Sequence, residues 1–400
     1  LEMRVLVSHP GMQHAHQLAW ALEAAGHLAA FWSGVPVVDS RYHKVGYWGI
    51  FAPHLRAIPV PAVKRKHPVV FPLLRKLCSS RMFGGMGNEL NHRLDRAYDF
   101  WVARGVRKLR PDMVVCYENS ALNTFKAAHE VGAICVLDAA SVHYLAARKW
   151  LKEVGQFNPA WIDVRKQEEI DLADAILTCS ELAAGTYQDA GVPSTKLFPV
   201  PLGTHMPETA LHDKAPGARC RFVFAGSLRS LKGVDVLLEI FEELEQEGIA
   251  AELVLIGGVA EKDLAKHAGR LPNVTHRPYM PQSELFAEMA HHDCLILPSR
   301  FDSFGMVVAE GMAVGLPAIV SDRVGAKCII EQHPDSGWIV PCDKAALKVA
   351  ILQVVRYPES LVTASRAARA AARDYSWESY RCRVVQTLEG IYARYVESAR

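Results

Sequence analysis

The stretch that decides the fold is PSRFDSFGMVVAEGMAVGLPAIVSD, residues Pro298 to Asp322. An apolar strand ends at Pro298, a polar loop follows, and Ser303-Phe304-Gly305 begins a helix that we expect to run to about Val314. Another apolar, β-branched run follows this helix at Ala318 to Ser321. Strand, loop, helix and strand in this order are typical of a parallel α/β sheet.

The same alternation extends on both sides of this stretch. In the first half we expect strands at Arg4–Ser8, Leu28–Trp32, Met113–Tyr117, Ile134–Asp138 and Ala175–Ser180. In the second half we expect them at Phe222–Ala225, Glu252–Ile256, Cys294–Pro298, Ala318–Ser321 and Trp338–Val340. A Pro-rich polar stretch, Pro199 to Arg219, separates the halves as a linker. We therefore predict an α/β fold with Rossmann-like domains at 1–203 and 204–375, and a helix at 376–400 that crosses back to the first domain.

Composition excludes several classes of protein. The 400 residues are 50% hydrophobic and 22% charged, with no apolar run near 18 residues, which argues against a disordered or a membrane-spanning chain. The net charge of +2 gives no general reason to expect nucleic-acid binding. The nine cysteines form no C-x-x-C pair, and no apolar signal segment of the secretory type begins the chain. We expect core thiols and a cytoplasmic protein.

The loop before the helix has the features of an anion site. Parallel sheets bind ligands beyond the carboxyl ends of their strands. Gly305 lets a ligand approach the backbone, and free N–H groups at the helix start suit a phosphate. Asp302 precedes the turn and Glu310 lies eight residues later, so both carboxylates can face one ligand. The alternative is that Asp302 only caps the helix and Glu310 is solvated.

This string resembles family 4 (group 1) of the retaining glycosyltransferases. The family pattern is an acidic residue, seven further residues and then Glu, followed by Gly-x-Pro. Asp302 and Glu310 match the two acidic positions, and Gly315-Leu316-Pro317 matches the Gly-x-Pro. The resemblance implies a GT-B fold, in which two Rossmann-like domains face a cleft. It also implies that Glu310 binds the nucleotide ribose and Asp302 the donor sugar, while the backbone of Ser303, Phe304, Gly305 and Met306 meets the diphosphate. The family usually has Glu where this chain has Asp302, which is shorter by about 1.5 Å, so sugar preference does not transfer.

A second loop resembles the phosphate loop of the same family, Gly-Arg-x4-Lys-Gly. It runs from Gly226 to Gly233, and the resemblance implies that Lys232 holds the donor pyrophosphate. Ser227 stands at the usual Arg position, and Arg229 is a candidate substitute two residues away. The alternative is that these cations are simply solvated.

Other matches are spread over the chain. The segment Asn273 to Leu285 resembles the one that holds the base, near Tyr279. His143, five residues after Asp138, looks like the first-domain histidine that faces the donor sugar, although a structural role is the alternative.

The first strand-to-helix loop carries weaker signals. Gly11 would leave room for an acceptor. His9, His14 and His16 have no acidic or thiolate ligand near them in sequence, so we expect no metal there. The loop lacks G-x-G-x-x-G and the chain has no D-x-D, so we expect no dinucleotide cofactor and no catalytic metal.

A basic tract lies in the first half. From Ser40 to Asn88 there are nine Lys or Arg and no Asp or Glu. Mixed basic and apolar residues suit an anionic membrane surface, where each cation contributes about 1 kcal/mol. We therefore expect residues 41–81 to face such a surface; a solvated loop or a site for an anionic acceptor are the alternatives.

The resemblance implies transfer of a sugar, with retained configuration and without a metal, from a nucleotide-sugar to an acceptor. UDP is common in the family, so we expect a UDP-sugar donor. A lipid-linked or cell-surface polysaccharide precursor, at the inner face of the plasma membrane, is one kind of acceptor that fits the resemblance. A non-catalytic sugar-nucleotide-binding or assembly subunit is the main alternative. An epimerase or phosphorylase of the same architecture and, more distantly, an oxidoreductase also stay open.

Overall fold

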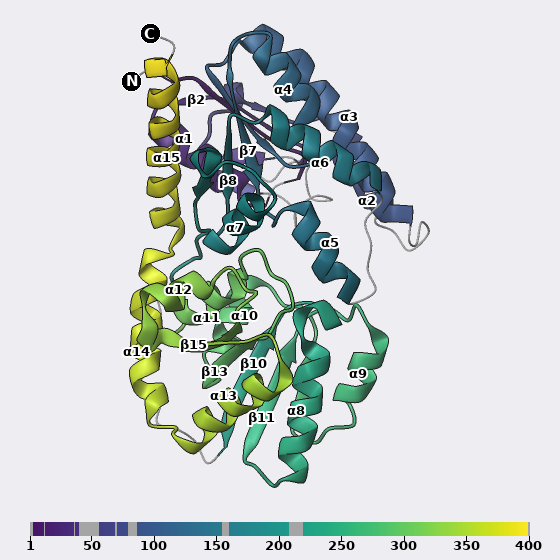
Figure 1. Cartoon of the computed structure of the whole chain (residues 1–400), viewed down its shortest axis with the longest axis vertical. Helices are drawn as coiled ribbons and strands as arrows, with labels where there is room; N and C mark the ends of the chain where they lie inside the picture. Colours follow the sequence, from purple (N-terminus) through teal and green to yellow (C-terminus); the bar gives the residue numbers. More distant parts are fainter. Residues whose placement is uncertain are drawn as a thin grey trace.

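The computed structural model describes residues 3–11, 13–35, 37–39, 56–68, 70–78, 86–153, 160–207 and 219–398. Positions 40–55, 69 and 79–85 of the basic tract lie outside these ranges, as do positions 208–218 of the predicted linker. Figure 1 shows two α/β units stacked along the long axis of the molecule, joined on one side by the C-terminal helix.

The first unit is built on a seven-stranded sheet with the order β5-β2-β1-β6-β7-β8-β9, parallel throughout. Its strands are β1 (Val5–His9), β2 (Leu28–Ser33), β5 (Arg65–Lys66), β6 (Met113–Tyr117), β7 (Ile134–Ala139), β8 (Ala175–Thr178) and β9 (Leu197–Pro199). Its helices are α1 (Ala15–Ala24), α2 (Val70–Cys78), α3 (Met86–Leu109), α4 (Leu122–His129), α5 (Tyr144–Glu153), α6 (Ala160–Leu172) and α7 (Glu181–Asp189). A separate parallel pair joins β3 (Val37–Asp39) to β4 (Arg56–Ile58).

The second unit is built on a six-stranded parallel sheet with the order β12-β11-β10-β13-β14-β15. Its strands are β10 (Cys220–Ala225), β11 (Ala251–Ile256), β12 (Val274–Arg277), β13 (Cys294–Leu297), β14 (Ala318–Ser321) and β15 (Gly337–Val340). Its helices are α8 (Val234–Gln246), α9 (Lys262–Ala268), α10 (Gln282–Met289), α11 (Met306–Ala313), α12 (Lys327–Gln332), α13 (Lys344–Arg356) and α14 (Ser360–Asp374).

The central strands are apolar runs because helices cover both faces of each sheet. In β1, β13 and β14 every residue is buried. The two parallel sheets of Rossmann-like character that the sequence predicts are thus confirmed. The predicted strand at Ala175–Ser180 ends earlier, at Thr178, because Ser180 is the N-cap of α7 and accepts a hydrogen bond from the backbone N–H of Ala183.

Short edge strands escaped the sequence analysis. In β12 only the first residue, Val274, is buried and the other three are exposed, so its composition carries little apolar signal. The strand β9 is an edge strand too, and it uses Pro199, with which the predicted linker begins. Proline is tolerated at a sheet edge because no neighbour there needs its missing N–H.

The C-terminal helix α15 (Trp377–Ser398) leaves the second unit and lies along α1 (Figure 1). Its side chains Tyr380, Val384, Leu388 and Ile391 are buried in the same hydrophobic core as β1. At the crossing point, the backbone N–H of Trp377 donates to the carbonyl of Thr204, 3.0 Å away. The two chain crossings between the units are thus bonded to each other.

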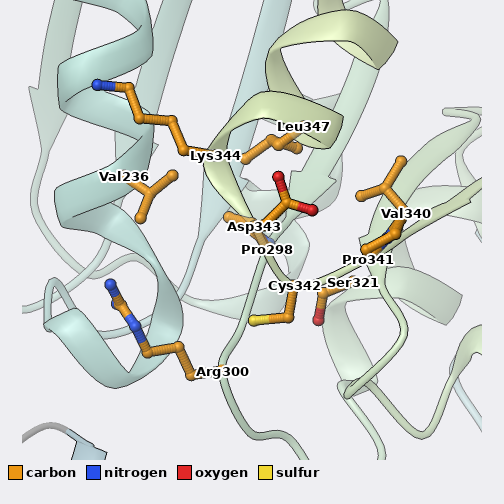
Figure 2. Close-up of a pocket in the computed structure, with 10 residues that line it drawn as sticks. All are labelled: Val236, Pro298, Arg300, Ser321, Val340, Pro341, Cys342, Asp343, Lys344 and Leu347. Atoms are coloured by element: carbon orange, nitrogen blue, oxygen red, sulfur yellow. The ribbon is translucent and has the colours of Figure 1, made fainter.

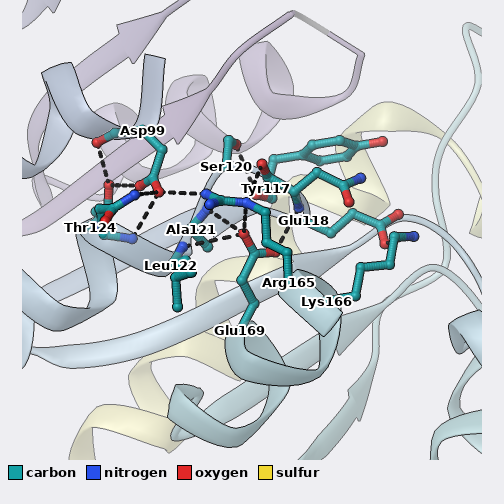
Figure 3. A network of polar contacts seen from close by, with 12 residues as sticks. Asp99, Tyr117, Glu118, Ser120, Ala121, Leu122, Thr124, Arg165, Lys166 and Glu169 are labelled. Atoms are coloured by element: carbon teal, nitrogen blue, oxygen red, sulfur yellow. Dashed lines mark hydrogen bonds and ion pairs between the residues drawn. The ribbon is translucent and has the colours of Figure 1, made fainter. Parts of the chain in front are cut away.

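A buried polar network fixes the start of α4, next to the carboxyl end of β6 (Figure 3). The carboxylate of Asp99 accepts a hydrogen bond from the backbone N–H of Thr124 at 2.9 Å, and that of Glu169 accepts one from Ala121 at 3.0 Å. Arg165 lies between the two acids, 2.6 Å from Asp99 and 3.2 Å from Glu169. Because each buried charge has an opposite partner, the network ties α3, α4 and α6 together.

Candidate functional site

The loop between β10 and α8 has a fixed shape. Glu261 accepts hydrogen bonds from the backbone N–H and the hydroxyl of Ser230, at 3.0 and 2.6 Å. Gly233 has a φ of +75°, and a Cβ there would lie 2.4 Å from the carbonyl oxygen of Pro298. Only glycine allows this approach, which presses the loop against the end of β13.

The approach brings the two predicted motifs into contact. The ammonium of Lys232 lies 2.6 Å from a carboxylate oxygen of Asp302, and both side chains are partly buried. The partners are 70 residues apart in the chain. The phosphate loop and the acidic loop therefore form one site.

The helix that follows Asp302 begins without a side-chain cap. Its N-cap is Gly305, with a φ of +88°, and in the described structure no side chain bonds the first turn of α11 there. A Cβ at Gly305 would lie 2.9 Å from Val324, so the turn is too tight for another residue. The backbone N–H groups of the first turn, at Met306 and Val307, are therefore available to an anion.

Glu310 lies one helical turn after Met306, on the same side of α11. Its carboxylate accepts a hydrogen bond of 2.6 Å from the side-chain amide of Gln282, the first residue of α10. Burial raises the pKa of Glu310 above its ordinary value. Gln282 was missed in the sequence, because an exposed amide at a helix start has no distinctive pattern.

Arg229 and Ser227, the other polar candidates in the phosphate loop, are half-buried. The Nε atom of Arg229 is buried and has no hydrogen-bond partner. A buried donor without a partner is rare in proteins and is often explained by a ligand. Gly226 fixes the base of the loop, because its N–H donates to the carbonyl of Ile256 at 2.8 Å.

A cavity of about 540 Å³ lies between the two units. The first unit and α15 supply most of its wall, and Gln282 and Met306 close it from the second unit. Its lining residues are Gln13, His14, His16, Gln17, Trp20, Ile58, Leu202, His205, Gln282, Met306 and Trp377. Since Gln282 holds Glu310 and Met306 begins α11, the cavity opens onto the site described above.

The first-domain histidine, His143, is buried beside two tyrosines. Its ring centroid lies 4.4 Å from that of Tyr144 and 5.1 Å from that of Tyr187, and its backbone N–H donates to the hydroxyl of Thr186. Burial lowers the pKa of His143 to about 4, so the ring is neutral at neutral pH. It is not among the residues that line the 540 Å³ cavity, and its role toward a donor sugar stays a prediction.

The remaining candidates are more dispersed. Tyr279 lies three residues before Gln282 and its side chain is 79% exposed. Gly11 donates its backbone N–H to His9 at 2.9 Å, two residues before the cavity residue Gln13. Phe304 is buried in the core, so its backbone alone can meet a ligand.

The acidic loop is attached to the first unit by several contacts. The hydroxyl of Ser180 donates to the carbonyl of Ser303 at 2.7 Å. An ion pair of 2.7 Å joins Arg323 to Glu153 at the end of α5. The apolar core of the second unit also continues into the first, through Val142, Cys179 and Ala183. These contacts hold the loop of Asp302 against the first unit.

A smaller hollow of about 160 Å³ lies beyond β13, β14 and β15 (Figure 2). Its cations already have acidic partners: Arg300 binds both carboxylate oxygens of Asp235 at 2.7 Å, and Lys344 extends toward α8, where it pairs with Glu239 and Glu243. Lys232 is paired as well, with Asp302, but α13 beside this hollow begins with a side-chain cap from Asp343, whereas α11 begins without one. The start of α11 therefore offers more to an anion than this hollow does.

Within the described ranges, one group of three potential metal ligands comes close together: His129, Cys135 and Asp174, with ligand atoms within 4.8 Å of one another. The Asp174 carboxylate already accepts a hydrogen bond from the backbone N–H of Cys135 at 2.8 Å, and burial raises the pKa of that thiol well above its usual range. Neither feature favours metal binding, which needs a free carboxylate and a thiolate.

The geometry agrees with comparisons to known proteins. Residues 213–371, about two fifths of the chain, match the family described as glycosyl transferases group 1. The chain is 31% identical over 174 residues to D-inositol 3-phosphate glycosyltransferase of Jonesia denitrificans, covering 39% of each protein. It is 25% identical over 320 residues to the MMP alpha-(1->4)-mannosyltransferase of Mycolicibacterium hassiacum, covering 75% of this chain and 76% of that one. The chain spans between 39% and 57% of the length of the first relatives that it matches.

Solved structures match the whole fold. Sucrose-phosphate synthase from Thermosynechococcus elongatus superposes with a TM-score of 0.67 at 18% identity, covering 98% of this chain and all of that one. Anabaena HepE, solved in complex with UDP and glucose, gives 0.65 at 14% identity, covering 97% of this chain and all of that one. The whole chain therefore has a GT-B fold, and residues 213–371 within it match the group 1 glycosyltransferase family. No helix in the described ranges is both long enough and apolar enough to cross a bilayer.

Proposed function

We propose that this protein transfers a sugar from a nucleotide-sugar to an acceptor bound in the cavity between its two domains. The observation that carries the proposal is the contact of Lys232 with Asp302 beside the uncapped start of α11. Glu310 lies one helical turn after that start. Groups suited to the sugar, the diphosphate and the ribose thus lie next to each other. The group 1 family match over residues 213–371 supports the same activity.

Each group has a distinct part in donor binding. The carboxylate of Glu310 accepts hydrogen bonds from the two ribose hydroxyls. The diphosphate lies against the first turn of α11, where backbone N–H groups and the helix dipole favour an anion. Lys232 and the unpartnered Nε of Arg229 add positive charge at the same place. Asp302 is left to bind hydroxyls of the donor sugar.

The reaction breaks the bond between the anomeric carbon and the diphosphate oxygen. Positive charge develops on the sugar and negative charge on the leaving diphosphate, so groups that already face the diphosphate lower the barrier. Loss of one such contact typically costs about 3 kcal/mol. Attack by the acceptor on the face that the diphosphate leaves would retain the anomeric configuration. In this proposal Lys232 and α11 provide the charge stabilisation, with no metal required.

UDP is the nucleotide that we propose. Anabaena HepE has the same fold and its structure holds UDP and glucose, which supports this choice. A thermal-shift screen of UDP, GDP and ADP with their glucose and mannose derivatives tests this choice. A ligand that binds the folded state raises its stability with the logarithm of the ligand concentration relative to Kd. UDP and one UDP-sugar should raise the melting temperature. A larger rise in melting temperature with GDP or ADP would show that this nucleotide, and not UDP, belongs to the donor.

We also propose that α2 docks on an anionic membrane surface to reach a lipid-linked or cell-surface polysaccharide precursor. Along α2, Val70, Leu73 and Leu77 are 60%, 46% and 52% exposed. The surrounding sequence from Ser40 to Asn88 has nine cations and no acid, which complements anionic lipid. The proposal places the protein in the cytoplasm at the inner face of the plasma membrane.

Sedimentation with phosphatidylglycerol vesicles tests this docking. The protein should bind these vesicles, bind phosphatidylcholine vesicles weakly, and lose binding in the double variant Leu73→Asp, Leu77→Asp. The matched control is Val349→Asp on α13, where the side chain is 63% exposed in the second domain. Failure to bind phosphatidylglycerol vesicles, or an equal loss in the control, would remove the membrane from the proposal. Equal binding to both kinds of vesicle would remove the role of the anionic charge.

Donor turnover tests the activity itself. With UDP-sugar alone, a transferase releases UDP and free sugar slowly, because water replaces the acceptor. A non-catalytic subunit of the same fold binds the donor and releases neither product. Binding without any release, with or without added sugars, would therefore favour the subunit and reject the transferase.

A further inference from the structure

A buried histidine–carboxylate pair lies beside the cavity between the domains, and its histidine, His14, lines that cavity. The Nε2 atom of His14 lies 2.8 and 3.0 Å from the two carboxylate oxygens of Asp138, and both side chains are largely buried. Asp138 belongs to β7, and His14 is the residue just before α1. The partners are 124 residues apart, so the fold itself creates the pair.

The pair has no evident task in holding the helix. His14 is the N-cap of α1, but its side chain makes no cap hydrogen bond. The edge of its ring faces Tyr380 of α15, with the centroids 6.1 Å apart, so the imidazole is held in one orientation. Because an ionised carboxylate can only accept, Nε2 carries the proton shared with Asp138. Nδ1 is then the ring nitrogen with a free lone pair.

The cavity in front of His14 suits an uncharged ligand rich in hydroxyls. Among the described residues that line it there is no Lys, Arg, Asp or Glu. Trp377 offers a flat apolar face, and Gln13, whose amide nitrogen donates to Tyr117, offers its amide oxygen. The ring of Trp20 and the amide oxygen of Gln17 already contact Arg381, at 4.1 and 2.8 Å, so of these two side chains the amide nitrogen of Gln17 is left to donate to a ligand. Met306, from the start of α11, belongs to the same wall, so a ligand in the cavity reaches the donor site.

We propose that His14, held by Asp138, binds the attacking hydroxyl of an uncharged sugar acceptor and takes its proton; this rests on the function proposed above. The O–H bond of the acceptor breaks and the proton moves to Nδ1. The electron pair of the oxygen forms the bond to the anomeric carbon, and the bond from that carbon to the diphosphate breaks with its electron pair on the diphosphate. Asp138 stabilises the imidazolium until its proton passes to water.

The variants His14→Ala and Asp138→Asn test the proposal on the full chain. Transfer from UDP-glucose to methyl α-glucoside or methyl α-mannoside, and to water when neither is added, should fall about 100- to 10,000-fold in His14→Ala. The affinity for UDP should stay within about twofold, which shows that the variant is folded. Free imidazole should restore part of the rate of His14→Ala, and Asp138→Asn should lower the rate with unchanged UDP affinity.

The matched control is His27→Ala. His27 also pairs with a carboxylate, that of Glu389 at 2.9 Å, but it does not line the cavity. Its removal should leave the rate within about twofold. The proposal is overturned if His14→Ala keeps its rate within threefold, if imidazole does not restore activity, or if UDP affinity falls as far as the rate does. If the unaltered protein releases no UDP from any donor, the proposed function fails instead.

Discussion

Replacement of Lys232 by Ala isolates the diphosphate contact. The ammonium of Lys232 lies 2.6 Å from Asp302 and is partly exposed, so it can reach a ligand without unfolding of the loop. A hydrogen bond to a charged group contributes about 1.5 to 3 kcal/mol, which corresponds to about a 10- to 150-fold change in affinity. Removal of the cation also leaves the carboxylate of Asp302 to repel the diphosphate, which acts in the same direction.

Calorimetric titration of Lys232→Ala with UDP and with uridine separates the two parts of the nucleotide. UDP affinity should fall about 10- to 150-fold, whereas uridine affinity should change less than about twofold because no phosphate is present. Lys348→Ala is the matched control, since Lys348 pairs with Glu243 and Glu247 at 2.7 Å on the surface and its loss changes the net charge equally. Equal losses for UDP and uridine would refute the phosphate role, as would an equal effect in the control.

Further variants test other parts of the molecule. Glu310→Ala should abolish UDP-sugar turnover while the circular dichroism melt is preserved; normal turnover would reject its ribose role. Burial lowers the pKa of His143 to about 4 in the folded state. As the pH falls below about 6.5, this histidine is therefore protonated in the unfolded chain before it is protonated in the folded one. Stability should then fall by up to about 3 kcal/mol toward pH 4, and urea titrations of His143→Asn should show a weaker pH dependence; an unchanged slope would contradict the cause. Ser180→Ala should lower the free energy of unfolding, measured in urea, by about 1 to 2 kcal/mol, because the variant loses the cap of α7 and the hydrogen bond to Ser303. A loss below about 0.3 kcal/mol would argue against a stabilising role of both contacts.

Local chemistry explains which parts of the site are readable from sequence. The order of strand, loop and helix around Gly305 is as the sequence predicts, but the helix begins at Met306 rather than at Ser303 to Gly305 and ends at Ala313 rather than Val314. A glycine with positive φ and an apolar strand leave a local signature, because they depend on neighbours in the chain.

Contacts between distant segments leave no such signature. Lys232 meets Asp302 because β10 lies beside β13 in the second sheet, so their following loops are neighbours. His14 meets Asp138 because the loop after β1 lies near the end of β7, with β6 between them. Strand order is set by packing of the whole sheet, which a single sequence does not reveal. The sequence therefore predicted the motifs but not their contacts.

A crystal of this protein soaked with UDP-glucose tests the donor site most directly. The diphosphate should lie against the backbone N–H groups of Met306 and Val307 and within hydrogen-bond distance of Lys232, with the ribose hydroxyls on Glu310. Density for the nucleotide elsewhere, such as the hollow beside Arg300 and Lys344, would contradict this assignment, and so would a diphosphate that leaves Lys232 paired with Asp302 alone.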